Sequence, residues 1–172
     1  AKKNNEDKQS FFLQNQSRAI YALGLMYEKG YGVKTDFSKA KELYKKSDSF
    51  GHELSKLRLE ALNGDADYSL YLAKFYFDGS MIDSGIPIDY EDSVFWYKIS
   101  EFLGVGDPEN FNKVLELISE IELNSASKRF EVWKANMGFE YDKETLKEVS
   151  AHFLNHYGTG FYVSENILIS NR

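Results

Sequence analysis

The segment Ala19-Ile-Tyr-Ala-Leu23-Gly24-Leu-Met-Tyr27-Glu-Lys-Gly30 has a counterpart 49 residues later, Tyr68-Ser-Leu-Tyr-Leu72-Ala73-Lys-Phe-Tyr76-Phe-Asp-Gly79. A second pair follows in the same order. Asp36-Phe37-Ser-Lys-Ala40-Lys-Glu-Leu43-Tyr44 matches Asp89-Tyr90-Glu-Asp-Ser93-Val-Phe-Trp96-Tyr97, which lies 53 residues later. The longer second offset places four extra residues in the central loop of the second copy. The chain therefore contains an internal repeat, which has to be recognised before the fold class is assigned.

Each copy has the pattern of a helix–turn–helix. Ala19, Leu23 and Tyr27 are spaced by four, so they share one stripe of a helix, and we expect this stripe to face the core. Gly30 then ends the first helix, and Asp36 is placed to cap the start of the second. We expect small residues to let the paired helices approach closely. These small residues are Gly24, Ala40, Ala73 and Ser93.

The composition indicates one all-α domain. The 172 residues are 42% hydrophobic and 16% aromatic, enough to build a core, and the two prolines leave long stretches free to be helical. We expect helices near 10–28, 37–49, 52–62, 66–77, 90–102, 109–122, 126–136 and 143–156. The tail 158–172 is left open between short strands and an extended segment packed on the last helices.

Charge and cysteine content exclude several classes of function. With 21 Lys and Arg against 27 Asp and Glu, the net charge is -6, which disfavours nucleic acid as a partner. The absence of cysteine excludes disulfides, thiolate zinc sites and a cysteine nucleophile. No apolar run is long enough for a membrane span. Because Ala1 stands where a Met is usual, a removed secretion signal stays open: the periplasm is expected in that case, and the cytoplasm otherwise.

The residues give little support for catalysis. The sequence contains no nucleophile elbow, P-loop, H-E-x-x-H or dinucleotide-binding motif. His152 and His156 are spaced to face one metal ion, but the neighbouring Phe153 and Leu154 favour a packing helix. We therefore expect no enzyme activity, no cofactor and no metal site.

The residues from Ala19 to Tyr44 follow the pattern A-x-x-x-L-G-x-x-Y-x-x-G-x-G-V-x-x-D-x-x-K-A-x-x-x-Y and resemble the Sel1-like repeat, which is similar to TPR repeats. The second copy is a more divergent match, with Ala73 in place of the family's Gly. Residues 111–135 are similar to the helix pair that closes such arrays. The resemblance implies a right-handed α-solenoid in a single domain over residues 1–172. Its parts are an N-terminal cap (1–16), repeat 1 (17–51), a linking helix (52–63), repeat 2 (64–104), a closing helix pair (105–137) and a C-terminal cap and tail (138–172).

The resemblance also implies a protein partner, because stacked helix pairs present an extended concave surface. Sel1-like proteins act as adaptors, and several that stand alone resemble immunity proteins that neutralise secreted toxins, phospholipases among them. We expect this chain to be an immunity protein that occludes a bacterial toxin effector. The alternative is an adaptor or scaffold in signalling or envelope assembly. The oligomeric state is left open.

Two sets of residues are candidates for the protein interface. The first set lies outside the inner stripe of the first helix of each copy and is expected to line the concave groove. It comprises Tyr21, Met26, Glu28, Tyr71, Lys74, Phe77 and Asp78. Packing of Tyr71 and Phe77 on the neighbouring helix layer is an equal alternative.

The second set is the loop 80–88 of the second copy, which is too apolar for a simple solvated turn. Met81, Ile82 and Ile86 are expected to insert into a cleft of the partner, or else to fold back over the core. A separate apolar tract, Phe11-Phe12-Leu13, precedes the first copy and needs a packing partner, either within an N-terminal capping helix or in a further repeat.

Overall fold

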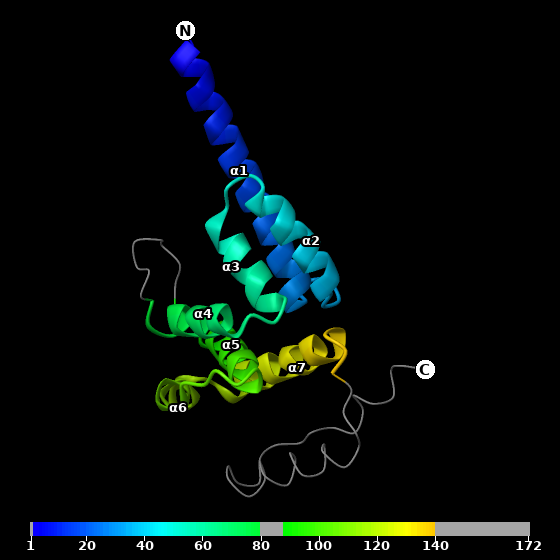
Figure 1. Ribbon diagram of the computed structural model, residues 1–172, viewed down its shortest axis with the longest axis vertical. Helices are drawn as coiled ribbons and strands as arrows, with labels where there is room; N and C mark the ends of the chain where they lie inside the picture. Colours follow the sequence, from blue (N-terminus) through cyan, green and yellow to red (C-terminus); the bar gives the residue numbers. More distant parts are fainter. Residues whose placement is uncertain (1, 80–87, 140–172) are drawn as a thin grey trace, which may run out of the picture. The chain divides into compact units, whose positions relative to one another are not determined.

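The computed structural model describes residues 2–79 and 88–139 and divides into two compact units, Ala1–Met137 and Gly138–Arg172. The regular structure in the described residues is entirely helical, as the sequence predicted (Figure 1). The fold class is that of an α-helical repeat solenoid. The helices are α1 (Lys2–Lys29), α2 (Phe37–Asp48), α3 (Glu53–Leu62), α4 (Ala66–Asp78), α5 (Tyr90–Phe102), α6 (Pro108–Leu117) and α7 (Glu120–Asn136).

The two sequence copies fold as two equivalent helix pairs, α1 with α2 and α4 with α5. In the first pair, the backbone N–H of Asp36 donates to the carbonyl of Tyr27 at 2.8 Å. In the second, the N–H of Asp89 donates to the carbonyl of Tyr76 at 3.0 Å. Tyr27 and Tyr76 are 49 residues apart, whereas Asp36 and Asp89 are 53 apart, so the four extra residues lie between the helices of the second pair.

Local sequence determines where these helices begin and end. Asp36 and Asp89 cap α2 and α5, as predicted, and their side chains accept hydrogen bonds from the N–H groups of Lys39 and Asp92. Gly79 ends α4 at a positive φ of 64°, a conformation that suits glycine. The caps therefore follow directly from residues recognised in the sequence.

Two helix boundaries differ from the expected ones. α1 begins at Lys2 rather than near residue 10. The break between α6 and α7 comes before Glu120, earlier than expected, because Ser119 and Glu122 form a reciprocal capping box that starts α7 there. The expected helix at 143–156 and the tail at 158–172 lie outside the described residues.

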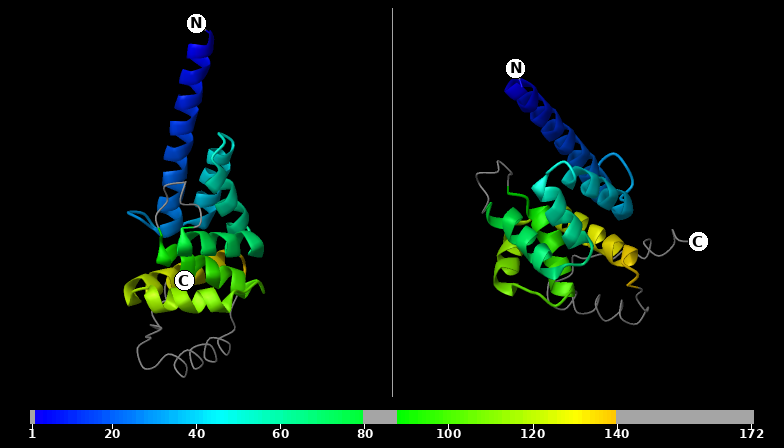
Figure 2. Two further views of the ribbon diagram at one scale, coloured as in Figure 1. Left: turned by 90° about the vertical axis from the view of Figure 1, so that its left-hand side faces the viewer. Right: turned by 45° about the horizontal axis from the view of Figure 1, so that its top comes forward.

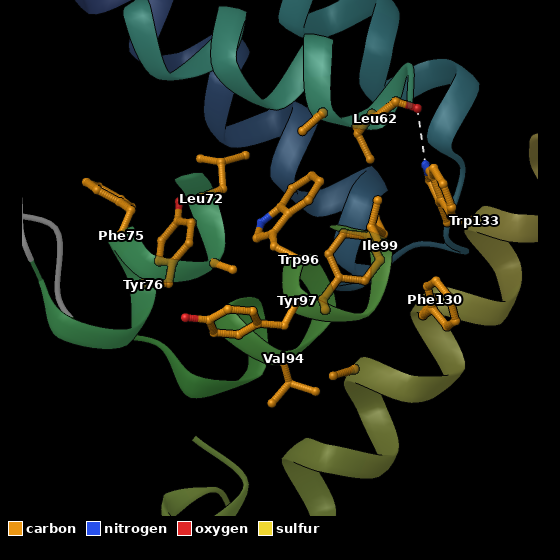
Figure 3. Close-up of a cluster of buried hydrophobic side chains, with 14 of the residues drawn as sticks. Leu62, Leu72, Phe75, Tyr76, Val94, Trp96, Tyr97, Ile99, Phe130 and Trp133 are labelled. Atoms are coloured by element: carbon orange, nitrogen blue, oxygen red, sulfur yellow. Dashed lines mark hydrogen bonds between the residues drawn. The ribbon is translucent and has the colours of Figure 1, made fainter. Parts of the chain in front are cut away.

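The core lies between the two repeats and the closing helices. Trp96 is fully buried in α5, at the centre of the aromatic and aliphatic cluster shown in Figure 3. Trp133 of α7 is also fully buried, and its indole N–H donates to the carbonyl of Leu62 in α3 at 3.1 Å (Figure 3). α7 therefore closes the core by joining the linking helix to the second repeat.

The expected inner stripe of the first helix is wrong for two of its three residues. Ala19 is exposed and Leu23 is 42% exposed, whereas Leu72, the counterpart of Leu23, is fully buried. The reason is that α3 packs on the corresponding face of α4, whereas no described helix packs on that face of α1. Of the three stripe residues, only Tyr27 packs against the core.

Candidate protein-binding surface

A buried network of charged side chains fixes the helices relative to one another. Arg58 of α3 lies at its centre and is 1% exposed. One guanidinium nitrogen donates to Glu28 Oε1 of α1 at 2.6 Å. The other donates to the Tyr76 hydroxyl of α4 at 2.8 Å and pairs with Asp92 of α5. Tyr44 of α2 donates to the second oxygen of Glu28 at 2.6 Å.

Asp92 extends the network to α7. Its second oxygen accepts from Arg129 Nη2 at 2.7 Å and lies 2.9 Å from Lys29 Nζ. Burial alone would raise the pKa of Asp92, but the charges of Arg58, Arg129 and Lys29 outweigh it and hold that pKa well below its ordinary value. Asp92 is therefore ionised in the folded protein at neutral pH.

This network is structural because its central groups are sealed from solvent. Arg58, Glu28 and Asp92 are each no more than 1% exposed, so a substrate cannot reach them. Elsewhere in the described residues, no group of three or more histidine, cysteine or acidic side chains is arranged to hold a metal ion. The chemistry that the described residues offer a partner therefore lies on the exposed faces of the helices.

The clearest of these exposed faces is on α4. Tyr71, which is 44% exposed, lies on it together with Lys74, whose ammonium group is 2.8 Å from Asp107 Oδ2. Hydrogen bonds from Lys74 and Asn110 lower the pKa of Asp107 to about 2. The face thus combines an aromatic ring with a charged pair that ties α4 to the start of α6.

A shallow hollow of about 200 Å³ adjoins Tyr71. It is lined by Leu57 of α3 and by Asp67, Tyr68 and Tyr71 of α4. Two tyrosines and a leucine supply apolar walls, and Asp67, an exposed residue, also contributes to the lining, which is almost entirely apolar. We call this site the α3–α4 hollow. It suits an apolar side chain or the apolar stem of a longer one.

The structure places the other candidate residues of repeat 1 differently. The expected exposure of Glu28 is wrong. Glu28 is fully buried, and its carboxylate accepts hydrogen bonds from Arg58 and Tyr44. Tyr21 is half-buried and stacks on the ring of His52, with the centroids 4.4 Å apart. Met26 is 40% exposed.

In the second repeat, Phe77 is half-buried and tilts against Tyr90, with ring centroids 6.5 Å apart, while Asp78 is exposed. Tyr71, Lys74 and Asp78 come together on one face of α4, and Tyr21 and Glu28 do not belong to it. The loop residues Met81, Ile82 and Ile86 lie outside the described residues. Whether any of these residues binds a partner stays a prediction.

Sequence reasoning missed the α3–α4 hollow. Asp67 and Tyr68 follow the N-cap Asp65, and their place in the sequence predicts only that a helix begins there. Leu57 lies on the linking helix, for which the repeat pattern gave no orientation. The available signal was the spacing of Asp67 and Tyr71, four residues apart and therefore on the same helix face.

Comparison with known protein families gives two matches to the Sel1 repeat, at residues 17–47 and 66–100. The chain carries two Sel1 repeats. The first match covers the second half of α1 and nearly all of α2, and the second covers α4 and most of α5, so each match corresponds to one helix pair. No curated protein and no solved structure matches the chain.

Sel1 repeats form a protein-interaction fold that is not catalytic in itself, so the chain is a protein–protein interaction module. Among the described residues, no helix is both long enough and apolar enough to cross a membrane. The exposed face of α4 and the α3–α4 hollow offer a partner aromatic groups beside a charged pair.

Proposed function

We propose that this Sel1-repeat protein is an immunity protein, which binds a secreted bacterial toxin effector, for example a phospholipase, and occludes its active site. The observation that carries the proposal is the exposed Tyr71 beside the α3–α4 hollow. Interface residues that contribute most to affinity are often aromatic side chains next to pockets. The buried network around Arg58 supports the proposal further, because it holds α3 and α4 in a fixed relation before the partner arrives.

The hollow indicates the chemistry of the contact. The exposed Asp67 lies one helical turn before Tyr71 on α4, and the whole chain carries a net charge of -6. A lysine or arginine of the effector would place its apolar stem against Leu57 and its charge near Asp67. We therefore propose that a basic side chain of the effector enters the α3–α4 hollow.

Replacing Tyr71 by alanine tests the surface. We expect Tyr71→Ala to weaken effector binding by about 2 kcal/mol, roughly thirtyfold, the size usual for a central aromatic anchor. Charge reversal at Lys74 and Asp78 should weaken binding as well. Affinity is measured by calorimetry with the toxin that co-purifies with this protein, and stability by the thermal midpoint, which we expect to stay nearly constant in Tyr71→Ala. Reversal of Lys74 also breaks its pair with Asp107, so a fall in the midpoint is expected for that variant.

The matched control is Tyr31→Ala, because Tyr31 is another exposed tyrosine, 53% accessible, and does not line the hollow. It should leave affinity unchanged. Equal losses in Tyr31→Ala and Tyr71→Ala would contradict a specific role for this face. A marked fall in the thermal midpoint of Tyr71→Ala would mean that Tyr71 has a structural role instead.

The loop 80–88 is a second proposed contact, resting on its apolar sequence alone. We expect deletion of Met81–Ser84, which restores the spacing of the first repeat, to leave a folded helical protein that no longer protects cells from the effector. Circular dichroism checks the fold, and survival of cells expressing the effector checks protection. Full affinity in the deletion variant would assign the interface to α4 and the hollow alone.

The alternative function is an adaptor or scaffold in signalling or envelope assembly, which would use the same interaction fold. Co-purification from the native source, followed by mass spectrometry, separates the two. Recovery of a toxin supports the immunity role, and recovery of a sensor or an envelope component supports the adaptor.

We propose the periplasm as the compartment of the immunity role if a secretion signal is removed before Ala1, and cell fractionation tests this.

A further inference from the structure

One face of α1 is apolar and is covered by no other described helix. It consists of four exposed residues in the second half of the helix: Ala19, Ala22, Leu23 and Met26. Their spacings of three, one and three are typical of a helix face that packs on another helix. Leu23 is 42% exposed and Met26 is 40% exposed. We call this surface the α1 face.

The second repeat shows what covers this face when it is buried. The counterparts of its four residues, 49 positions later, are Tyr68, Tyr71, Leu72 and Phe75. Leu57 of α3 lines the α3–α4 hollow together with the two tyrosines. Leu72 and Phe75 are 0% and 5% exposed. The face of α4 therefore receives the helix that directly precedes it in the chain.

Residues 4–13 of α1 hold the position of that preceding helix in repeat 1. The same offset of 49 relates them to α3 and places Leu13 at the position of Leu62, the last residue of α3. In the structure these residues continue the line of α1, and no other described helix lies beside them (Figures 1 and 2). Phe11 and Phe12 are 66% and 67% exposed. The segment thus ends in exposed aromatic rings, while the face that its counterpart would cover is open.

The two halves of α1 meet just before Ser17, where support from α2 ends. The hydroxyl of Ser47, in the last turn of α2, donates to the carbonyl of Ser17 at 2.7 Å. Asn15 corresponds to Gly64, which turns the chain between α3 and α4 at a φ of 96°, and asparagine adopts positive φ more readily than most residues. The Ser17 hydroxyl donates to the carbonyl of Gln14 at 2.8 Å, an acceptor that a break in the helix would otherwise leave free. The junction therefore has the residues that a turn needs.

We propose that residues 2–13 fold back on the α1 face through a turn at residues 14–16, and that they then cap the N-terminal end of the repeat array. In this closed form the segment covers the second half of α1 as α3 covers α4. The continuous α1 is the open form. The proposal does not rest on the function proposed above, because it involves neither α4 nor the α3–α4 hollow.

The side chains of the segment and of the α1 face have complementary sizes. Phe12 stands where α3 has the small Ala61, and the face has Ala19 and Ala22 where α4 has tyrosines. A large residue on the segment thus meets small residues on the face, the reverse of the arrangement in repeat 2. The rest of the segment, KKNNEDKQS, is polar, as the solvent side of a terminal cap has to be.

The closed form removes exposed apolar surface from both halves of α1 at once. Opening the helix at residues 14–16 frees only backbone groups that water can reach, because all three residues are exposed. The open form gains little from keeping the segment in line, since isolated helices shorter than about 12–15 residues are marginal in water. The balance between the two forms therefore depends on the turn and on the apolar contact.

Cross-linking of Lys8→Cys to Ala22→Cys in one chain tests the fold-back, since the chain has no cysteine of its own. The counterparts of these two positions, Leu57 and Tyr71, line one hollow. In a continuous helix the two cysteines are about 21 Å apart, too far for a short bismaleimide. We expect an intramolecular cross-link, detected by mass spectrometry. The control is Lys8→Cys with Tyr31→Cys, because Tyr31 is exposed but lies beyond the end of α1, and it should give none.

Substitutions of the exposed Asn15 test the turn in the same cross-linking assay. Asn15→Gly should cross-link about fivefold faster than Asn15→Ala, because alanine favours the continuous helix over glycine by roughly that factor. Circular dichroism of the variants before cross-linking checks that the helical fold is kept. No intramolecular cross-link even in Asn15→Gly would overturn the proposal and leave the α1 face to a different protein. Cross-links only between two chains would overturn it in favour of a second copy, and equal rates in the two Asn15 variants would overturn the turn.

Discussion

Trp96→Ala is expected to lower the free energy of unfolding by about 3–5 kcal/mol, the usual range for removing a large aromatic side chain from a core. Trp96 is fully buried in α5 and packs against Phe95, with ring centroids 4.7 Å apart. The guanidinium of Arg58 lies 5.5 Å from its ring centroid. The substitution thus leaves a cavity at the junction of the linking helix and repeat 2. It also removes the aromatic ring that lies beside Arg58, the centre of the buried charge network. Urea denaturation followed by circular dichroism measures the loss.

Trp96→Phe is the matched control. The indole N–H of Trp96 is buried without a hydrogen-bond partner among the described residues, so phenylalanine removes an unsatisfied donor while keeping much of the ring volume. We expect a much smaller loss than for alanine. A loss below about 1 kcal/mol in Trp96→Ala would mean that the core relaxes around the site and that this tryptophan does not hold the repeats together.

The repeat and its turns were predictable because they depend on neighbouring residues. A cap such as Asp36 needs only the backbone N–H three residues later, and a close helix pair needs a small residue such as Gly24 at the crossing. Built onto Gly24, a Cβ would lie 2.6 Å from the Tyr44 ring, which explains the glycine. Such contacts leave a regular spacing in the sequence, which is why the two helix pairs and their caps were predictable.

The burial of particular faces was not predictable in the same way. Leu23 and Leu72 occupy equivalent positions in the two repeats, yet Leu23 is 42% exposed and Leu72 is fully buried. Burial depends on whether another helix packs on that face. Glu28 has the sequence signature of a surface residue. It is buried because Arg58, 30 residues later, returns to it in space. Pairings at such separations leave no periodic pattern in a single sequence.

Arg58→Met is expected to cost about 3–5 kcal/mol of unfolding free energy, because it leaves Glu28 and Asp92 buried without one of their main partners. Methionine keeps much of the side-chain volume, so the loss reports mainly on charge. Lys113→Met is the control: the pair of Lys113 with Glu109 is exposed on α6, and its removal should leave the free energy of unfolding nearly unchanged. Chemical denaturation at neutral pH measures both variants. Similar losses in the two would contradict a special role for the buried network.

The pH dependence of stability gives an independent test of the same network. The pKa of Asp92 is depressed in the folded protein below its ordinary value of 3.8, so its contribution is present above that value and is lost as the pH falls below it. Wild-type protein should therefore lose stability more steeply below about pH 4 than Asp92→Asn, which cannot titrate at this position.

At neutral pH, Arg58→Met combined with Asp92→Asn should cost less than the sum of the single variants, because each removes the other's unpaired charge. Additive losses, with parallel pH profiles for wild type and Asp92→Asn, would show that Arg58 and Asp92 stabilise the fold independently of each other.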